Sequence, residues 1–263
     1  MRYLPSIYIK KKIQIALMGF ILTSVSGALQ ADPIVTDRPD FTESSEVVPN
    51  RSFQIESGYS YQEKDASKEH AVGEMLLRIS ITPKIEARVG INSLSFKEEG
   101  AEKRSGLEDT SLGVKIKLLE GQEGTFLPNF AAIVGFSLPT GGHDFRENAV
   151  QPELKLCSTW DLNESLSLGA NLNAGWASEA GKRFNQLSAS LALAISLTEN
   201  WGTFIELYGF RPVSADGSNS THFHTGFAYL LSEDTQLDVR YGKGLTSEKE
   251  YFIGFGLSSR FGY

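Results

Sequence analysis

His222 and His224 are the first candidates for a chemical role in this 263-residue chain. One residue separates them in the sequence. On an extended strand both imidazoles would face the same side, where they could bind a metal ion. No third candidate ligand lies at a spacing from them that is typical of metal sites. We therefore expect no metal site, and two histidines on one face of a strand are the simpler interpretation.

A second candidate is the pair His143 and Asp144, in a glycine-rich stretch at residues 139–145. A histidine beside a carboxylate could belong to a hydrolase site, but no arrangement of serine, histidine and asparagine accompanies it. Glycine pairs at residues 140–142 and 242–244 lack the strand-to-helix context of phosphate-binding loops. These patterns favour an exposed loop, and we expect no bound cofactor.

The third set is larger and consists of charged residues that alternate with apolar ones. In residues 186–197 every second residue is apolar and the residues between are small or polar. A period of two indicates a β-strand with one apolar face. The same pattern recurs at residues 53–61, 73–82, 85–92, 111–118, 130–138, 153–160, 166–176, 201–208, 223–231, 237–241 and 251–263.

These twelve expected strands need a surface to cover their apolar faces. The last one, residues 251–263, places aromatic residues at both ends of its apolar face. Aromatic girdles at two interfaces are typical of strands that cross a bilayer. A soluble all-β domain, with this segment as a half-buried edge strand, is the alternative that this strand alone leaves open.

The lengths of the links discriminate between these alternatives. Links expected to be short fall at residues 82–84, 119–127, 161–164, 198–200 and 232–235. Links expected to be longer fall at residues 62–72, 97–106, 139–149, 177–184, 212–220 and 246–250. Short turns that alternate with longer loops are typical of bacterial outer-membrane barrels, although the link at 119–127 is long for its class. We predict an all-β, antiparallel, up-and-down transmembrane barrel of about twelve strands.

Composition and charge agree with this prediction. Residues 10–12 are three lysines, followed by an apolar stretch at 13–25 and small residues up to Ala31, which is the pattern of a signal peptide. Removal of residues 1–31 takes away Arg2 and these three lysines and no acid, so the net charge falls from −7 to −11. An acidic exported chain is a poor candidate for nucleic-acid binding. The mean hydropathy is −0.18, and a single cysteine, Cys157, excludes an internal disulfide.

The expected domains are therefore a signal peptide at 1–31, a coil at 32–50 and a barrel at 51–263. The coil holds three prolines, which interrupt helices and strand ladders, and we expect it at the periplasmic mouth or in the lumen. Its charged motif, Asp37, Arg38 and Asp40, would dock it to lumen charges as a plug.

The register of the strands points a set of charged side chains into the lumen, where twelve strands leave only a narrow space. The candidate lumen or transport residues are Glu56, Arg78, Glu86, Arg88, Lys115, Lys117, Glu153, Lys155, Glu206, Asp238, Arg240 and Arg260. With Glu74 and Asp109 the two signs are equal in number. A selective ion pore would carry one sign, so this balance suggests neutral substrates or a salt-bridged interior around a plug. A polar network that only satisfies itself is the alternative.

Five segments carry a resemblance to a known family. They are residues 36–44 (TDRPDFTES), 53–59 (FQIESGY), 137–141 (SLPTG), 206–210 (ELYGF) and 236–242 (QLDVRYG). Together they resemble the MetA-pathway phenol-degradation family of outer-membrane barrels, over essentially the whole mature chain. The resemblance implies a channel or transporter for small, hydrophobic or aromatic solutes, and it assigns no site residues.

The expected partners are outer-membrane lipid, the outer-membrane assembly machinery and a small-molecule solute, and no catalytic residue is expected. Two other functions stay open on the sequence. One is an outer-membrane hydrolase with its site in the external loops, and the other is a structural or adhesive surface barrel.

Overall fold

The computed structural model describes residues 32–263 except 92, 123–124, 180 and 247–248, and these residues form an all-β structure. The expected signal peptide at 1–31 lies outside the described residues. Among the described residues, no helix has the length and apolar character needed to cross a membrane.

The strands follow one another along the chain with short connections. They are β1 (Ser52–Lys64), β2 (Ser67–Thr82), β3 (Ile85–Ile91), β4 (Leu94–Glu99), β5 (Glu102–Leu107), β6 (Thr110–Leu119), β7 (Asn129–Leu138), β8 (Gln151–Asn163), β9 (Leu166–Glu179), β10 (Lys182–Ser196), β11 (Trp201–Arg211), β12 (Ser220–Ser232), β13 (Thr235–Gly244) and β14 (Glu250–Gly262).

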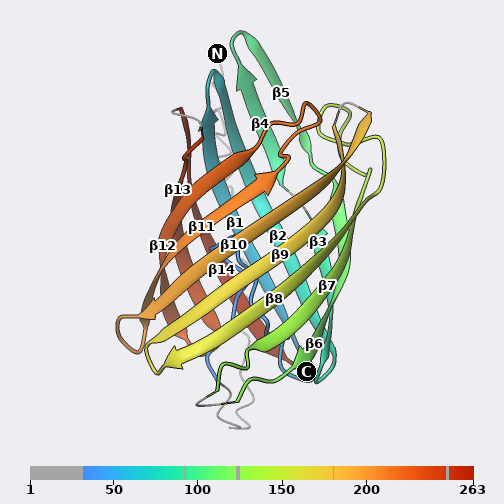
Figure 1. Cartoon of the computed structure of the whole chain (residues 1–263). Coiled ribbons are helices and arrows are strands. Elements are labelled where there is room, and N and C mark those ends of the chain that lie inside the picture. Colours follow the sequence, from blue (N-terminus) through green and yellow to red (C-terminus); the bar gives the residue numbers. More distant parts are fainter. Residues whose placement is uncertain (1–31, 92, 123–124, 180, 247–248) are drawn as a thin grey trace, which may run out of the picture. The chain divides into compact units, whose positions relative to one another are not determined.

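Twelve of these strands close into a barrel (Figure 1). Strands of the ring pair antiparallel with the ring strands before and after them in the chain, so that β3 pairs with β6 past the β4–β5 hairpin. β1 closes the ring by pairing with β14 on one side and β2 on the other. The two remaining strands, β4 and β5, form a hairpin that pairs with the outer part of β2 and extends beyond the ring. The prediction of a twelve-stranded antiparallel barrel is confirmed.

The outer surface of the barrel is apolar between two aromatic levels. On β14 the outward residues include Tyr251 and Phe261, which contact Tyr61 and Phe53 of β1 respectively. The two are ten positions apart, which is roughly 33 Å of strand and, at a tilt of about 40°, a height of about 25 Å. That height matches the apolar band of an outer-membrane barrel.

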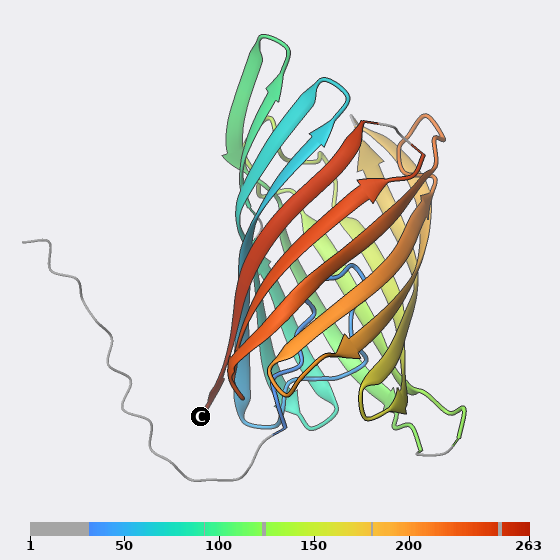
Figure 2. The same ribbon diagram turned by 90° about the vertical axis from the view of Figure 1, so that its left-hand side faces the viewer.

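The connections at the end of the barrel where β1 begins are mostly tight, as expected. At the opposite end, the loops expected at residues 139–149, 212–220 and 246–250 contain little or no strand. The loops expected at 62–72, 97–106 and 177–184 are wrong, because these residues largely continue the strands into extended hairpins (Figure 2).

These extensions are rich in charged residues, so they lack the alternation of apolar and polar residues that identifies the other strands. In the β4–β5 hairpin the cross-strand pair Glu98 and Lys103 forms an ion pair of 2.5 Å, and Arg104 reaches Glu99 at 3.2 Å. A hairpin outside the bilayer needs no apolar face, so the backbone ladder and such pairs are sufficient. Asp65 and Gly100 adopt φ values of 53° and 60° in the tight turns.

Residues 32–50 contain no strand or helix and lie inside the ring (Figure 2). We call this segment the plug. It starts beside the β12–β13 turn, where the Ile34 amide donates to the Glu233 carbonyl at 2.7 Å. It rises into the lumen and returns to the same end of the barrel, where β1 begins at Ser52.

Candidate functional site: the plugged lumen

The lumen is lined by the polar faces of the strands, and the plug fills its middle. The alternation of each strand turns charged residues inward, where they pair with one another, with the plug or with water. The plug has no ladder of its own, so its backbone groups bond to these side chains instead. The site is therefore a set of contacts between one coil and many strands.

The densest set of contacts surrounds Asp37, and we call it the Asp37 cluster. It comprises three buried acids and three buried bases: Asp37, Glu56, Glu86, Arg78, Arg88 and Lys115. The Asp37 carboxylate accepts from Arg88 at 2.6 Å and from Lys115 at 2.9 Å. Arg78 pairs with Glu86 at 2.9 Å and with Glu56 at 3.0 Å. Buried ions are tolerated here because each one has partners of the opposite sign.

The same side chains also bond to the plug backbone. Glu56 accepts from the amides of Asp37 and Arg38 at 3.0–3.1 Å. Arg78 donates to the carbonyls of Val35 and Glu46. Burial alone would raise the pKa of the Asp37 carboxyl, but the neighbouring Arg78, Lys115 and Arg88 hold it well below its ordinary value. Asp37 is therefore an anion that fastens the plug to β2, β3 and β6.

Arg38 crosses the lumen to another part of the wall. Its guanidinium lies 2.8 Å from Glu74 of β2 and 3.4 Å from Asp238 of β13. It passes so close to Gly58 and Gly256 that a Cβ atom at either position would lie 2.4 Å from an Arg38 nitrogen. Glycine at both positions therefore makes room for this arginine.

Arg240 shares one partner with Arg38 and bonds to the plug as well. It pairs with Glu74 at 2.9 Å and donates to the Pro39 carbonyl at 3.4 Å. Glu74 thus joins one arginine of the plug to one arginine of the wall.

Glu206 holds the highest turn of the plug. Its carboxylate accepts from the amides of Phe41 and Thr42 at 2.9 and 2.7 Å and from the Thr42 hydroxyl at 2.6 Å. His224 lies 2.7 Å away through Nδ1 and supplies the fourth contact. Both β11 and β12 therefore serve to position the plug.

An aromatic group lies on the same side of the lumen. The Phe41 ring stacks on Tyr208 with 4.5 Å between centroids, and Tyr208 stacks on His222 at 4.8 Å. Phe210 meets Phe41 edge to face at 5.3 Å. This wall offers aromatic faces where the wall around Asp37 offers charges.

Asp40 is a half-buried acid of the plug, and like Asp32 it forms no ion pair among the described residues. Burial and the neighbouring negative charge of Glu206 raise the pKa of its carboxyl well above the ordinary value. Asp40 therefore differs from Asp37, although only two residues separate them.

The remaining predicted residues lie at the two edges of the plug. Lys155 pairs with Glu43 of the plug, and Glu153, whose side chain is 42% exposed, lies 3.6 Å from Lys155. Lys117 pairs with Glu46 at 2.9 Å. Arg260 lies at the turn end of the barrel, where it pairs with Asp234 at 2.7 Å and donates to the Asp32 carbonyl. The predicted charges thus all line the inside, but they form several separate groups.

Cavities remain on both sides of the plug. On the loop side, two of about 420 and 270 Å³ are lined by residues including Arg88, Lys155 and Arg240. On the turn side, one of about 330 Å³ is lined by residues including Phe204. Arg38 and Asp40 line both the cavity of about 270 Å³ and the cavity on the turn side. The plug is therefore thin at the turn that contains Arg38 and Asp40.

Several site residues are not among those that the sequence predicts. Glu43, Thr42 and Phe41 follow the predicted charged motif directly. Glu74 counts toward the predicted charge balance and Tyr208 lies on the same strand face as Glu206, but neither is a predicted site residue. The alternation that identifies Glu206 also places Tyr208 and Glu74 on the inward faces of strands that face the plug.

The two histidine candidates lie apart from each other. His222 and His224 face the lumen and pair with Glu250 and Glu206. His143 is exposed and lies 2.9 Å from Asp144 in the link between β7 and β8. Within the described part of the chain, no three His, Cys, Asp or Glu side chains are grouped so as to hold a metal ion.

Solved structures with the same fold are outer-membrane proteins. The COG4313 outer membrane channel from Pseudomonas putida F1 is 17% identical, with a TM-score of 0.68 over 82% of this chain and 98% of that chain. The KdgM porin, solved with disordered oligogalacturonate, is 10% identical, with a TM-score of 0.54 over 79% and 99%. The NanC porin is 11% identical, with a TM-score of 0.53 over 78% and 98%.

A comparison with curated protein sequences found no match. The barrel, its apolar outer band and these neighbours place the chain in the bacterial outer membrane. A family model matches residues 36–261, which include nearly all of the plug and the barrel. The chain belongs to the family described as "Putative MetA-pathway of phenol degradation".

Proposed function

We propose that this protein is an outer-membrane channel for small solutes in which the plug forms the constriction. The observation that carries the proposal is the pair of cavities that share Arg38 and Asp40. A solute would need only this turn of the plug to shift in order to pass between them. The similar channel and porins support the same function.

The solutes that fit this path best are small and aromatic or otherwise hydrophobic. The cavity of about 270 Å³ above the turn is lined on one side by Phe41, Tyr208, His224 and Phe252. Aromatic faces bind rings by offset stacking or edge contacts. Apart from Asp40, the charged residues on the other side already have partners of opposite sign, so they offer little to an ionic solute.

We propose further that the barrel is not an enzyme. The pair His143 and Asp144 is exposed in a loop, and the described contacts bring no serine hydroxyl to it. His224 is engaged with Glu206, which holds the plug. Neither histidine therefore has the nucleophile that a hydrolase would require.

The first test compares solute flux through the parent protein and a variant that lacks residues 32–48. Liposome swelling with phenol-sized neutral solutes should be faster for the shortened variant, because the constriction is gone. Swelling by neither protein would overturn the channel and favour a structural or adhesive barrel. Heat-modified mobility on gels reports whether the shortened barrel folds.

A second test keeps the plug and fixes its upper turn. The Thr42 and Ser190 hydroxyls are 2.7 Å apart, so a Thr42→Cys, Ser190→Cys variant in a Cys157→Ser background should form a disulfide. Oxidation should lower the flux and reduction should restore it. The matched control is Thr235→Cys, Ser259→Cys, two wall positions whose hydroxyls are 3.4 Å apart and which leave the plug free. Equal flux in the oxidised and reduced states of the first pair would show that this turn does not move.

A further inference from the structure

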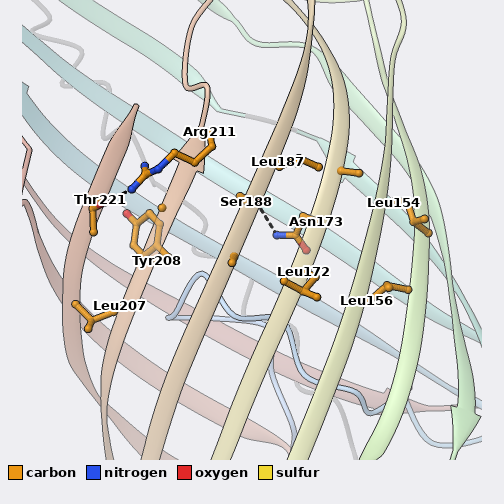
Figure 3. Close-up of a pocket in the computed structure, with 13 residues that line it drawn as sticks. Leu154, Leu156, Leu172, Asn173, Leu187, Ser188, Leu207, Tyr208, Arg211 and Thr221 are labelled. Atoms are coloured by element: carbon orange, nitrogen blue, oxygen red, sulfur yellow. Dashed lines mark hydrogen bonds between the residues drawn. The ribbon is translucent and has the colours of Figure 1, made fainter. Parts of the chain in front are cut away.

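The outer wall of the barrel carries a hollow of about 660 Å³ that the channel does not use (Figure 3). It crosses the outward faces of β8 to β12. Leu154 and Leu156 lie at its β8 end, and Arg211 and Thr221 lie at its β11–β12 end. Of the residues that line it, Tyr208 also lines the cavity of about 270 Å³ beside the plug.

Small residues explain why the wall is concave here. Ala189 of β10 stands opposite Gly209 of β11, and Ala174 of β9 stands opposite Leu187 of β10. Leucines at the edges rise above this floor, and they are exposed: Leu154, Leu172, Leu187 and Leu207 are between 36% and 65% exposed. On the lipid-facing side of a barrel, such an apolar hollow is filled by hydrocarbon.

The hollow lies toward the loop end of the barrel. Arg211 is the last residue of β11, and Leu187 and Leu154 lie closer to the loop ends of β10 and β8 than to their turn ends. Longer loops face the cell exterior in barrels of this class. The hollow therefore opens to the outer leaflet, with Arg211 near the level of the headgroups.

Arg211 is held in place without a carboxylate. Its Nη1 donates to the carbonyls of Phe210 and Ser220 at 2.7 and 2.6 Å, and its Nη2 donates to the Thr221 hydroxyl at 2.9 Å. These contacts leave the edge formed by Nε–H and the second Nη2–H without a partner among the described residues. This edge is the fork with which arginine binds a phosphate through two parallel hydrogen bonds.

We propose that the hollow binds a phosphorylated glycolipid of the outer leaflet, with an acyl chain across the leucines and a phosphate on Arg211. A flexible acyl chain fits an irregular apolar floor. A second barrel would have to present a convex patch and an acid at matching positions. The fixed positive charge at the end of the hollow nearest the headgroups favours the lipid.

The test measures lipid bound to the purified, detergent-solubilised full barrel by native mass spectrometry. The probes are lipid A carrying its phosphates and the same lipid after phosphatase treatment. The parent should retain the phosphorylated form about tenfold better, which is the contrast expected for losing a charge-assisted pair of hydrogen bonds. Equal retention of the two forms would overturn the assignment of the phosphate to Arg211.

Two variants probe the two parts of the site separately. Arg211→Gln should remove the preference for the phosphorylated lipid, and Ala189→Leu should lower the retention of both lipids by filling the floor. The matched control is Lys243→Gln, an exposed base on the outward face of β13 that does not line the hollow. It should bind like the parent.

The outcomes distinguish a bound lipid from a second copy of the barrel. If both variants retain lipid A like the parent, the proposal is wrong. If Ala189→Leu instead converts a dimer of the parent to a monomer, the hollow is an interface between two copies and the lipid is excluded. Heat-modified mobility confirms that each variant is folded, so a loss of lipid cannot be attributed to unfolding.

Discussion

The two walls of the lumen hold the plug by different means. Around Asp37, the wall formed by β1, β2, β3 and β6 supplies three bases and two acids, all buried and all paired. The wall formed by β11 and β12 supplies Glu206, two histidines and aromatic rings, and leaves the cavity beside Asp40. The first wall is closed by charge neutralisation, while the second keeps space that a solute could use.

The comparison shows how one coil can be both anchored and adjustable. Removing a partner from a neutral buried cluster strands several charges at once, so the Asp37 side should yield only with a large loss of stability. The contacts of the Glu206 side are hydrogen bonds and ring stacking, whose individual contributions are smaller. We therefore expect variants on the Asp37 side mainly to lose stability and variants on the Glu206 side mainly to gain solute flux.

The largest effect is expected for Arg78→Met, which leaves Glu56 and Glu86 buried without their main cation. The free energy of unfolding should fall by about 3–5 kcal/mol, measured by urea unfolding in detergent. The control is Arg104→Met, whose side chain is 40% exposed in the β4–β5 hairpin. It should change stability by less than about 0.5 kcal/mol. Equal effects of the two variants would contradict a large contribution of the Asp37 cluster to stability.

The next effect is expected for Glu206→Gln. The amide presents its own N–H groups to the donors of the plug, so part of the turn at Phe41 and Thr42 loses its acceptor. The docked turn should lose about 1–3 kcal/mol, and single-channel conductance should rise. Glu153→Gln is the control, because Glu153 makes one long ion pair at the edge of the plug. A rise of the same size in the control would contradict a specific role for Glu206.

Asp40 sharpens the comparison through pH. Its pKa is raised above 3.8 when the turn is docked, so protonation favours docking, and this stabilisation is lost as the pH rises through the raised pKa. Conductance of the parent should therefore fall on acidification from neutral pH, whereas Asp40→Asn should stay low throughout. The difference at neutral pH should be a few-fold, roughly 1 kcal/mol.

Asp37 should respond in the opposite direction. Its pKa is lowered, so its contribution is present at neutral pH and is lost only as the pH falls through that low value. A parent conductance that rises on mild acidification, with Asp40→Asn behaving alike, would contradict the assignment of Asp40 to the adjustable wall.

The smallest effect is expected for Phe41→Leu, which removes the stacking on Tyr208 and keeps an apolar side chain. The docked turn should lose about 0.5–1.5 kcal/mol, seen as a small rise in conductance and weaker block by aromatic solutes. Phe227→Leu, on the lipid-facing side of β12 and 48% exposed, is the control and should leave both measurements unchanged.

Much of the barrel could be predicted from alternation alone. The inward placement of Arg78, Lys115 and Glu206 followed from their neighbours in the chain, because adjacent residues of a strand face opposite sides. The extended hairpins could not be predicted in this way. The β4–β5 hairpin carries charges on both faces, with Glu98 and Lys103 on one and Lys97 and Arg104 on the other. Outside the bilayer nothing requires an apolar side.

The groups within the site could not be predicted either. Alternation gives the face of Glu56 or Arg240 but not its height, which depends on the stagger between strands around the whole ring. Thr42 and Glu206 are separated by 164 residues and meet only after the ring has closed around the plug. No pattern in the local sequence indicates that these two residues come into contact.

The sequence by itself determined that this chain forms a closed antiparallel barrel with a charged interior, because a period of two and aromatic ends act within each strand. Only the tertiary structure decided which charges meet and where the plug turns. The plug has no periodicity, so its path is selected by long-range hydrogen bonds and ion pairs that exist only inside the closed barrel.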